Sequence, residues 1–296
     1  MSKQIQRIIV ITGGTAGIGY QSAKGLAKKG VKIFITGRNQ ERGEKAQQSL
    51  IAETGNDQIQ FVVGNVSSIA GVDSLASLLI EEVDHIDVLI NNAGYLGSEF
   101  RKNDDDLEMH FAVNVLAPRR FTLALLPLLK VGKNARVLNI TGGDKPALID
   151  IDNLQAEKGF KGLMTYTHSK SVMEAMSMAL ASELEPEGVS VNVIFPGRAS
   201  TNMTNSLSMK SLPGPLKLMF PIFKFLFRED GGKSATKAAQ STIWGASTPD
   251  LDGMTGSYFD TNIKEQKLHS TAYDLKVQER IVSIIKAAQN KKSVDS

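Results

Sequence analysis

A tyrosine and a lysine four positions apart, Tyr166 and Lys170, are the side chains best suited to chemistry in this sequence. In a helix they lie on one face, with Cβ atoms about 5–6 Å apart. A free phenol has a pKa of roughly 10 and exchanges protons poorly at neutral pH. A nearby ammonium group stabilises the phenolate and lowers that pKa, which suits proton exchange with a hydroxyl or carbonyl oxygen. The pair is also a frequent chance pattern, so this prediction needs support from other segments.

A glycine-rich turn follows the first apolar run of the chain. Residues 12–19 read TGGTAGIG, and a helix-type pattern begins directly after them. A strand that turns tightly into a helix beside a pyrophosphate has no room for side chains, because backbone N–H groups must approach the phosphates. The spacing differs by one residue from the common G-x-G-x-x-G pattern. We predict cofactor contacts here at Gly13, Thr15, Gly17, Ile18 and Gly19.

The end of the second apolar run indicates which dinucleotide binds. NAD-binding domains place an acidic residue there, about 20 residues past the glycines, to hold the ribose 2′-hydroxyl. Here the run ends in Thr36-Gly37-Arg38-Asn39, and the first carboxylate is Glu41. Arg38 offers a planar, permanently charged set of donors that suits a 2′-phosphate. We therefore predict NADP(H) as the cofactor; the alternative is that Arg38 is an ordinary surface arginine at a strand end.

Two further apolar runs end in small or amide residues. The third ends in Gly64-Asn65-Val66, and the fourth runs into Asn91-Asn92-Ala93-Gly94. Open parallel sheets bind ligands outside the carboxyl ends of their strands. Small residues there let the backbone pass close to an adenosine ribose. The predicted cofactor contacts in these segments are Asn65, Val66, Asn92, Ala93 and Gly94.

Strand-like and helix-like patterns alternate over the first two hundred residues. The expected strands are Arg7–Thr12, Lys32–Thr36, Gln58–Gly64, Val88–Asn91, Arg136–Ile140 and Ser190–Phe195. The expected helices are Tyr20–Lys29, Asn39–Thr54, Val72–Val83, Asp106–Leu129 and Tyr166–Glu185. Such alternation predicts an α/β fold, a doubly wound parallel sheet of the Rossmann type with helices on both faces. Without a linker or repeat, we expect one domain over residues 1–296.

The alternation breaks after Pro196. Residues 202–231 contain an apolar stretch, Leu216–Phe227, that is interrupted by Pro221. We interpret this segment as a lid over a lipophilic substrate; contact with a membrane surface or a partner subunit is the alternative, since the stretch is too short to cross a bilayer. A helix at Lys233–Ala246, a strand at Gly256–Phe259 and a helical tail over residues 271–296 follow.

Composition excludes several classes of function. The chain of 296 residues has no cysteine, so it has neither disulfides nor thiolate metal sites. A net charge of +3, with Lys and Arg spread along the chain, does not favour nucleic acid. The four histidines lack metal-ligand spacing, and we predict no metal. No stretch approaches the roughly 20 apolar residues of a membrane span, so we expect a cytoplasmic protein.

Together these motifs closely resemble the short-chain dehydrogenase/reductase family. The likeness runs from Ile8 to about Gly197 and covers, in order, TGGTAGIG, GNV, NNAG, a later asparagine, YTHSK and PGRAST. Within the family, the chain looks most like the retinol-dehydrogenase-like group. The shared features are Arg38, the Asp152-Asn153-Leu154 segment before the tyrosine, and Gly256–Phe259 near the end.

The resemblance implies a role for each matching residue. Tyr166 is expected to be the general acid/base, and Lys170 to bind the nicotinamide ribose and lower the tyrosine pKa. Asn114 is expected to hold a water that relays protons to Lys170. The residues expected to line the nicotinamide are Pro196, Gly197 and Thr201, with Thr201 at its carboxamide. Dimers and tetramers are usual in the family, so a homo-oligomer is possible.

One position departs from the family pattern. A serine normally ends the fifth strand and hydrogen-bonds the substrate oxygen, but here that position is Gly142. Thr141 stands next to it, and alternation along a strand points its side chain to the opposite face. Either Thr141, brought inward by an irregular strand end, or another hydroxyl replaces the serine, or a substrate-orienting hydrogen bond is lost. Losing one such donor costs about 10²–10³ in rate in other enzymes.

Two functions follow from this pattern. The first is an NADP(H)-dependent oxidoreductase that interconverts a lipophilic aldehyde or ketone and its alcohol, with Tyr166 moving the proton. The second is an NADP(H)-binding sensor or scaffold of the same fold, in which Gly142 has weakened catalysis. The intact set of Tyr166, Lys170 and Asn114 favours the enzyme, because a protein that only binds has no evident need of all three.

Overall fold

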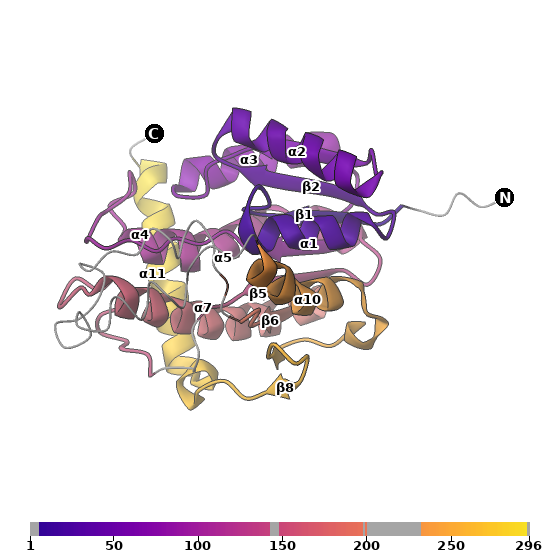
Figure 1. Cartoon of the computed structure of the whole chain (residues 1–296). Coiled ribbons are helices and arrows are strands. Elements are labelled where there is room, and N and C mark those ends of the chain that lie inside the picture. The colour runs from indigo at the N-terminus through magenta and orange to yellow at the C-terminus, as the bar shows by residue number, and fades with distance from the viewer. Residues whose placement is uncertain (1–5, 143–147, 198, 200–231, 295–296) are drawn as a thin grey trace.

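The computed structural model describes residues 6–142, 148–197, 199 and 232–294. Its central feature is a single sheet of eight strands in the order β3-β2-β1-β4-β5-β6-β7-β8 (Figure 1). The strands are β1 (Ile8–Ile11), β2 (Lys32–Gly37), β3 (Ile59–Val63), β4 (Val88–Asn91), β5 (Arg136–Ile140), β6 (Ser190–Ile194), β7 (Tyr258–Phe259) and β8 (Glu265–Gln266). The first seven are parallel, and the strand order reverses at β1, as in a doubly wound sheet. The predicted fold class is therefore confirmed.

The sequence patterns located the parallel strands within about two residues. All residues of β1, β4, β5 and β6 are buried, because helices cover both faces of the sheet. The edge strand β8 was not predicted. It pairs antiparallel with β7 through only two residues, Glu265 and Gln266, and both are exposed. A polar edge strand of this length carries no hydrophobic alternation that a sequence reader could recognise.

Helices cover the two faces of the sheet in two groups (Figure 1). One group is α1 (Gly17–Ala27), α2 (Gln40–Thr54) and α10 (Lys233–Ser247), whose apolar residues share a buried cluster with β1 and β2. The other is α3 (Ile69–Glu82), α5 (Ala117–Ala124), α6 (Leu126–Val131), α7 (Gly162–Leu184) and α11 (Leu275–Val294). Short 3₁₀ turns occur at Glu185–Glu187, Pro249–Leu251 and Ser270–Tyr273.

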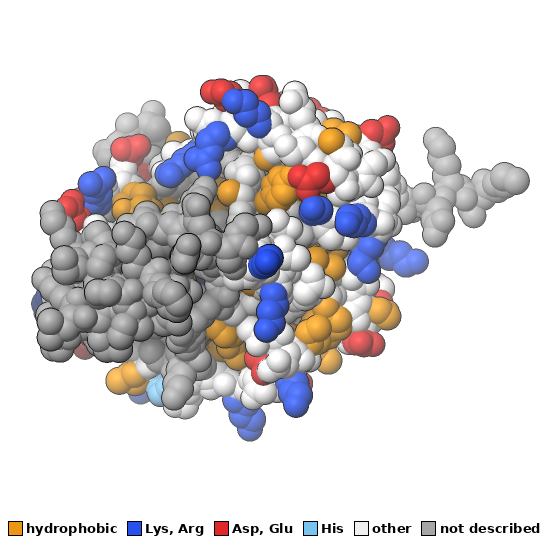
Figure 2. Space-filling model, viewed as in Figure 1, with side chains coloured by type: hydrophobic (Ala, Val, Ile, Leu, Met, Phe, Trp, Pro, Cys, Tyr) orange, Lys and Arg blue, Asp and Glu red, His pale blue; other side chains and the backbone are white. Residues whose placement is uncertain are grey.

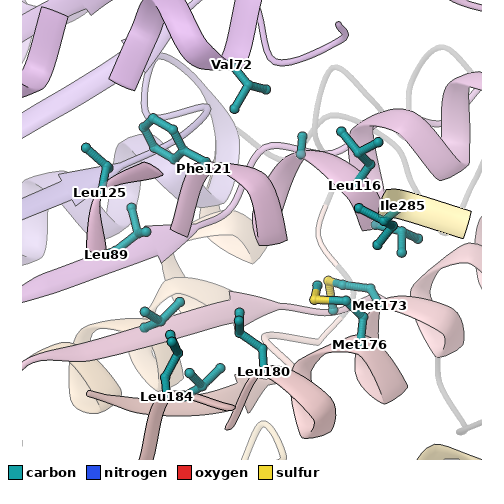
Figure 3. Close-up of a cluster of buried hydrophobic side chains, with 14 of the residues drawn as sticks. Val72, Leu89, Leu116, Phe121, Leu125, Met173, Met176, Leu180, Leu184 and Ile285 are labelled. Atoms are coloured by element: carbon teal, nitrogen blue, oxygen red, sulfur yellow. The ribbon is translucent and has the colours of Figure 1, made fainter. Parts of the chain in front are cut away.

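The larger core lies between the sheet and the second group of helices. Figure 3 shows side chains from several elements that point toward one another in this layer: Val72, Leu89, Leu116, Phe121, Leu125, Met173, Met176, Leu180, Leu184 and Ile285. Ile285 belongs to α11, so the last helix of the chain completes a core that begins at β1. Because α7 is packed on both its sheet side and its α11 side, its position is strongly fixed.

The prediction of a single helix over Asp106–Leu129 is wrong. The structure divides this region into α4 (Met109–Phe111), a π-helical turn over Ala112–Leu116, then α5 and α6. The break between α5 and α6 falls at Leu125, just before Pro127, which lacks the N–H that a continuous helix needs. Local π-helical turns often mark functional sites, and this one has Asn114 at its centre.

Charged side chains of both signs are spread over the described part of one face of the molecule. Figure 2 shows Lys and Arg side chains in several places over the visible face, with Asp and Glu side chains among them.

Within the described ranges, none of the helices combines the length and the apolar character that a membrane crossing requires. The predicted substrate lid at 202–231 lies outside the described residues. The predicted cytoplasmic location stays a prediction.

Candidate active site

The glycine-rich turn joins β1 to α1 at the carboxyl edge of the sheet. Gly13 and Gly17 have φ values of 65° and 56°, a left-handed conformation that strains other residues. A Cβ atom on Gly19 would lie 2.4 Å from both the Asn92 amide nitrogen and the Gly13 carbonyl oxygen. The glycines therefore serve two purposes: two allow the turn, and Gly19 allows α1 to lie close to the strand ends.

The first turn of α1 suits an anion. Its N-cap residue, Ala16, provides no side-chain acceptor, whereas Asn39 caps α2 and Ser68 caps α3 through their side chains. The first-turn N–H groups of α1 are thus left without a side-chain cap at the end of the helix that carries the positive partial charge. Such a terminus, reached by a glycine turn, fits the pyrophosphate of a dinucleotide. The residues present therefore fit the predicted cofactor.

Asn92 connects the tip of β4 to this turn. Its side-chain amide donates to the carbonyl oxygens of Thr12, at 3.0 Å, and Gly13, at 3.2 Å. In return the Thr12 hydroxyl accepts hydrogen bonds from the backbone N–H groups of Asn92 and Ala93, both at 3.0 Å. The structure thus brings two predicted cofactor segments together, and the Asn92 side chain fixes the shape of the glycine turn.

The residues predicted at the adenosine end lie along the same edge. Arg38 is exposed just after β2, and Asn65 is exposed just after β3. Thr15 is packed so closely on Gly37 that a Cβ atom at 37 would lie 2.9 Å from its methyl carbon. The charges of Arg38 and Arg101 oppose the rise that burial causes in the pKa of Tyr95. Arg38 therefore stands on the same side of the molecule as the loop that follows β4.

Tyr166 and Lys170 occupy the first part of α7, five and nine residues into the helix. The Lys170 side chain is only 4% exposed, and its Nζ atom donates to the Ile140 carbonyl oxygen at 3.0 Å. The same Nζ atom lies 6.0 Å from the centre of the Tyr166 ring. Both side chains therefore reach the carboxyl end of β5.

Burial governs the protonation of this pair. It raises the pKa of Tyr166 above its ordinary value, and it lowers the pKa of Lys170 to about 8. The resemblance led us to expect a lowered tyrosine pKa. The structure shows the reverse because burial desolvates the phenol and so disfavours the phenolate. At neutral pH the tyrosine therefore keeps its proton.

Asn114 holds the loop after β4 against the start of α7. Its Oδ1 atom accepts from the Tyr95 N–H at 2.8 Å, and its Nδ2 atom donates to the Tyr95 carbonyl oxygen at 3.0 Å. Nδ2 also donates to the Ser169 hydroxyl at 2.9 Å, and Ser169 donates to the Tyr166 carbonyl oxygen. The predicted proton relay through Asn114 stays a prediction, but its side chain evidently positions the helix that carries Tyr166.

Gly142 and Thr141 occupy very different surroundings. A Cβ atom on Gly142 would lie 2.3 Å from the Tyr166 hydroxyl oxygen, so the backbone at 142 lies directly against the phenol. Thr141 is buried, and its hydroxyl donates to Glu174 Oε1 at 2.6 Å. The structure therefore does not bring the Thr141 hydroxyl to Tyr166 as a substitute for the missing serine.

Glu174 was missed in the sequence. It lies four residues after Lys170 in α7, and it is 6% exposed. Burial raises its pKa to about 7, while the Thr141 hydroxyl and the charge of Lys170 act in the opposite direction. The signal was present, because Tyr166, Lys170 and Glu174 follow one another at i, i+4 and i+8 and share one helix face.

Two histidines hold the loops that frame the site. His168 accepts a hydrogen bond from the Asp150 N–H at 3.0 Å, and burial lowers the pKa of His168. His110 accepts from the Gly97 N–H at 3.1 Å and binds the buried Glu108 through its other ring nitrogen at 2.6 Å. Both side chains therefore have structural partners.

The expected nicotinamide segment is described only in part. Pro196 is buried, and Gly197 has a φ value of 89°. A Cβ atom at 197 would lie 2.6 Å from a methyl carbon of Thr261. Thr201, the predicted contact of the carboxamide, lies outside the described residues. Ile18, another predicted contact, packs on a small apolar cluster formed by Ala199 and by Ala235 and Ala238 of α10.

A doubly wound parallel sheet, a glycine turn into an uncapped helix, and a tyrosine–lysine pair at the same edge define a dinucleotide-binding α/β protein. Residues 7–211 match the family model of the short chain dehydrogenases. The match extends over more than half of the chain, and the protein belongs to this family of oxidoreductases.

Known proteins agree with this assignment. Mouse (Mus musculus) retinol dehydrogenase 11 is 30% identical over 254 residues, which are 86% of this chain and 77% of the relative. The Pseudomonas aeruginosa RhlG/NADP active-site complex is 29% identical, with a TM-score of 0.63 over 86% of this chain and 94% of that one. A short chain dehydrogenase of Shigella flexneri complexed with NADP is 26% identical, with a TM-score of 0.64 over 86% and 97%. The expected likeness to the retinol-dehydrogenase-like group is confirmed.

Proposed function

We propose that this protein is an NADP(H)-dependent oxidoreductase that interconverts a lipophilic aldehyde or ketone and its alcohol, with Tyr166 as the general acid/base. The observation that carries the proposal is the meeting of Tyr166, Lys170 and the end of β5 at the carboxyl edge of the sheet. This is the edge that the glycine turn also reaches, so proton transfer and dinucleotide binding are served by one side of the molecule.

The cofactor is proposed to be held by the first turn of α1 and by Arg38. When bound, NADPH supplies the hydride of the reaction. The uncapped N–H groups of α1 suit the pyrophosphate, and the exposed guanidinium of Arg38 suits the 2′-phosphate. Two solved relatives described above bind NADP, which supports the same choice here. Lys170 and the Pro196–Gly197 turn are proposed to lie at the nicotinamide end.

The protonation states favour reduction of a carbonyl at neutral pH. Burial raises the pKa of Tyr166, so its hydroxyl carries the proton that a carbonyl oxygen needs as it becomes an alcohol. Lys170, with a pKa of about 8, is mostly charged at pH 7 and stabilises the phenolate left after that transfer. In the oxidation direction the same groups take up the proton of the alcohol at higher pH.

The lipophilic substrate class rests on two observations. The retinol dehydrogenase relatives act, by name, on a lipophilic alcohol. Exposed apolar side chains also occur on both segments that frame the described site: Phe100 is 41% exposed in the loop after β4, and Leu148 and Met164 are 68% and 54% exposed near the start of α7. Apolar side chains on the rim of a site favour an apolar ligand.

The alternative function, an NADP(H) sensor or scaffold with weakened catalysis, is favoured by one observation. No side chain at 142 is present to donate to a substrate oxygen, and Thr141 donates to Glu174 instead. Tight NADPH binding with no turnover over a panel of aldehydes and ketones supports this alternative. Brisk turnover in the native protein excludes it.

The decisive test of the mechanism is Tyr166→Phe. We expect turnover, followed by the loss of NADPH absorbance with a lipophilic ketone, to fall by about 10²–10⁴-fold while the NADPH dissociation constant is unchanged. Tyr273→Phe is the matched control, because the exposed Tyr273 side chain lies just before α11 and its hydroxyl accepts from the Leu268 N–H. Full turnover in Tyr166→Phe contradicts the proposed role of this residue.

A further inference from the structure

A buried carboxylate directly behind the catalytic lysine has no part in the reaction proposed above. Glu174 lies one helical turn after Lys170, and the two side chains are 6% and 4% exposed. An isolated buried charge is costly, and a carboxylate in such a place normally has a partner or a task. The hydroxyl of Thr141 is a neutral donor and does not balance the charge.

We propose that Glu174, held in place by Thr141, is the counter-ion of Lys170, and that it acts as a positioning residue that keeps the lysine charged beside Tyr166. The inference deepens the proposed function, since it assigns a task to a group that acts through Lys170. It also replaces the expectation that Thr141 contacts the substrate. In this proposal Thr141 affects the reaction only by hydrogen-bonding the Glu174 carboxylate, which in turn acts on Lys170.

The geometry places both charges at one strand end. Lys170 donates to the backbone carbonyl of Ile140, and the next residue of the chain, Thr141, donates to Glu174. Ile140, the last residue of β5, and Thr141, the residue after it, thus bind two side chains on consecutive turns of α7. A shift of the helix relative to the strand breaks both hydrogen bonds together, so the carboxylate and the ammonium group keep a fixed relation to each other.

The electrostatic effects agree with this pairing. Burial lowers the pKa of Lys170, and the charge of Glu174 opposes that fall. Burial raises the pKa of Glu174, and both Thr141 and Lys170 oppose that rise. Among the residues that the structure describes, the other titratable groups on this side include Tyr166 on α7 and Tyr258 on β7. The pKa of Tyr258 is raised by burial, by Glu174 and by Asp260, so this phenol stays neutral and does not compete for the lysine.

The test is a direct titration of Lys170. In protein labelled with ¹³C at lysine Cε, the Lys170 signal is identified by its loss in Lys170→Arg, and its pKa is read from a pH series. We expect Glu174→Gln to lower this pKa by about one unit, the lower end of the effect of a close opposite charge. Glu185→Gln, the same change at an exposed position after α7, is expected to leave it unchanged.

A second variant separates the charge from its support. Thr141→Val keeps the shape but removes the donor that stabilises the carboxylate, so the pKa of Glu174 rises further above about 7 and the side chain loses part of its charge at neutral pH. We expect a smaller fall of the Lys170 pKa in Thr141→Val, and no further fall when this change is added to Glu174→Gln. In an active enzyme the alkaline limb of the kcat/KM profile should shift with the same sign and size.

The titration decides the inference without relying on turnover. If the Lys170 pKa is the same in native protein, Glu174→Gln and Thr141→Val, Glu174 is a structural residue only and the inference is overturned. Should Glu174→Gln fail to fold, Thr141→Val alone carries the test, because it retains the carboxylate. A fully active Tyr166→Phe variant would overturn the proposed mechanism and leave the Lys170–Glu174 pairing to be judged on the titration.

Discussion

The replacement of Gly142 by alanine is the sharpest test of how the tyrosine is placed. An added Cβ atom would lie 2.3 Å from the Tyr166 hydroxyl oxygen and 3.2 Å from the ring carbon that bears it. An ordinary contact of this kind is longer by about 1 Å, and close packing leaves little room for the backbone to yield. The phenol must therefore swing away by roughly that distance.

A displacement of about 1 Å at a reacting group can cost about 10²-fold in rate. We expect kcat of Gly142→Ala to fall by about that factor with a lipophilic ketone, while the NADPH dissociation constant stays within twofold. The assay is the single-turnover loss of NADPH absorbance at saturating cofactor, because it reports the chemical step apart from product release.

Gly142→Ser is the matched comparison, since it adds the same Cβ atom together with a hydroxyl. On our reasoning the serine variant suffers the same displacement, and the new hydroxyl recovers only part of the loss. The reasoning is refuted if Gly142→Ala retains native turnover. It is also refuted if Gly142→Ser exceeds native turnover, which the sensor alternative predicts.

Three further predictions concern the cofactor, the fold and pH. In fluorescence titrations, Arg38→Ala should raise the NADPH dissociation constant by about 10–100-fold, because one charge-assisted contact with the 2′-phosphate is lost. The NADH dissociation constant should stay unchanged. Equal effects on both cofactors would contradict the proposed contact of Arg38 with the 2′-phosphate. Asp252→Ala should lower the free energy of unfolding in urea by about 2 kcal/mol, because it leaves the fully buried Arg136 guanidinium without its half-exposed carboxylate partner. The control, Asp250→Ala, changes an exposed aspartate and should cost less than about 0.5 kcal/mol. Similar losses in both variants would argue against the ion pair. In the Glu174→Gln background, which leaves no unpaired carboxylate, Lys170→Met should stabilise the protein at pH 7 by up to about 3 kcal/mol, because burial lowers the pKa of Lys170 from 10.5 to about 8. Between these two pKa values the native state binds fewer protons than the unfolded state, so the stability of the protein that retains Lys170 rises with pH. In urea titrations the extra stability of the Lys170→Met protein should therefore shrink from pH 8 to 10.5. Extra stability that does not change with pH would contradict burial of the ammonium group as its cause.

The sequence was sufficient for most of the fold because the parallel strands are buried on both faces. Runs such as Ile8–Ile11 and Val88–Asn91 are wholly buried, and their apolar character is visible without any structure. The errors fell where local pattern carries no such information. The polar strand Glu265–Gln266 is defined only by its partner, and the break before Pro127 interrupts a hydrophobic pattern that reads as one helix.

The site was predictable to the extent that it follows from spacing. Helical periodicity placed Tyr166 and Lys170 on one face, and the glycine turn placed the first turn of α1 beside Asn92. The direction in which the Thr141 side chain points was harder to predict from the sequence. Whether Thr141 turns toward the tyrosine or toward Glu174 depends on how α7 lies across β5, which is a tertiary relation. The sign of the tyrosine pKa shift likewise depends on burial, which a motif does not reveal.

The packing of α11 has a consequence for how the protein is made. The core layer on the α7 side includes Val277, Ile281 and Ile285, which come from the last helix, together with residues of β1 and α3 from the first third of the chain. A ribosome releases these segments far apart in time, so the nascent chain holds an incomplete apolar layer until synthesis is almost finished. Met173 and Met176, the α7 residues labelled near Ile285 in Figure 3, belong to that layer, so a nonsense mutation shortly before α11 should yield an aggregating product rather than a smaller enzyme.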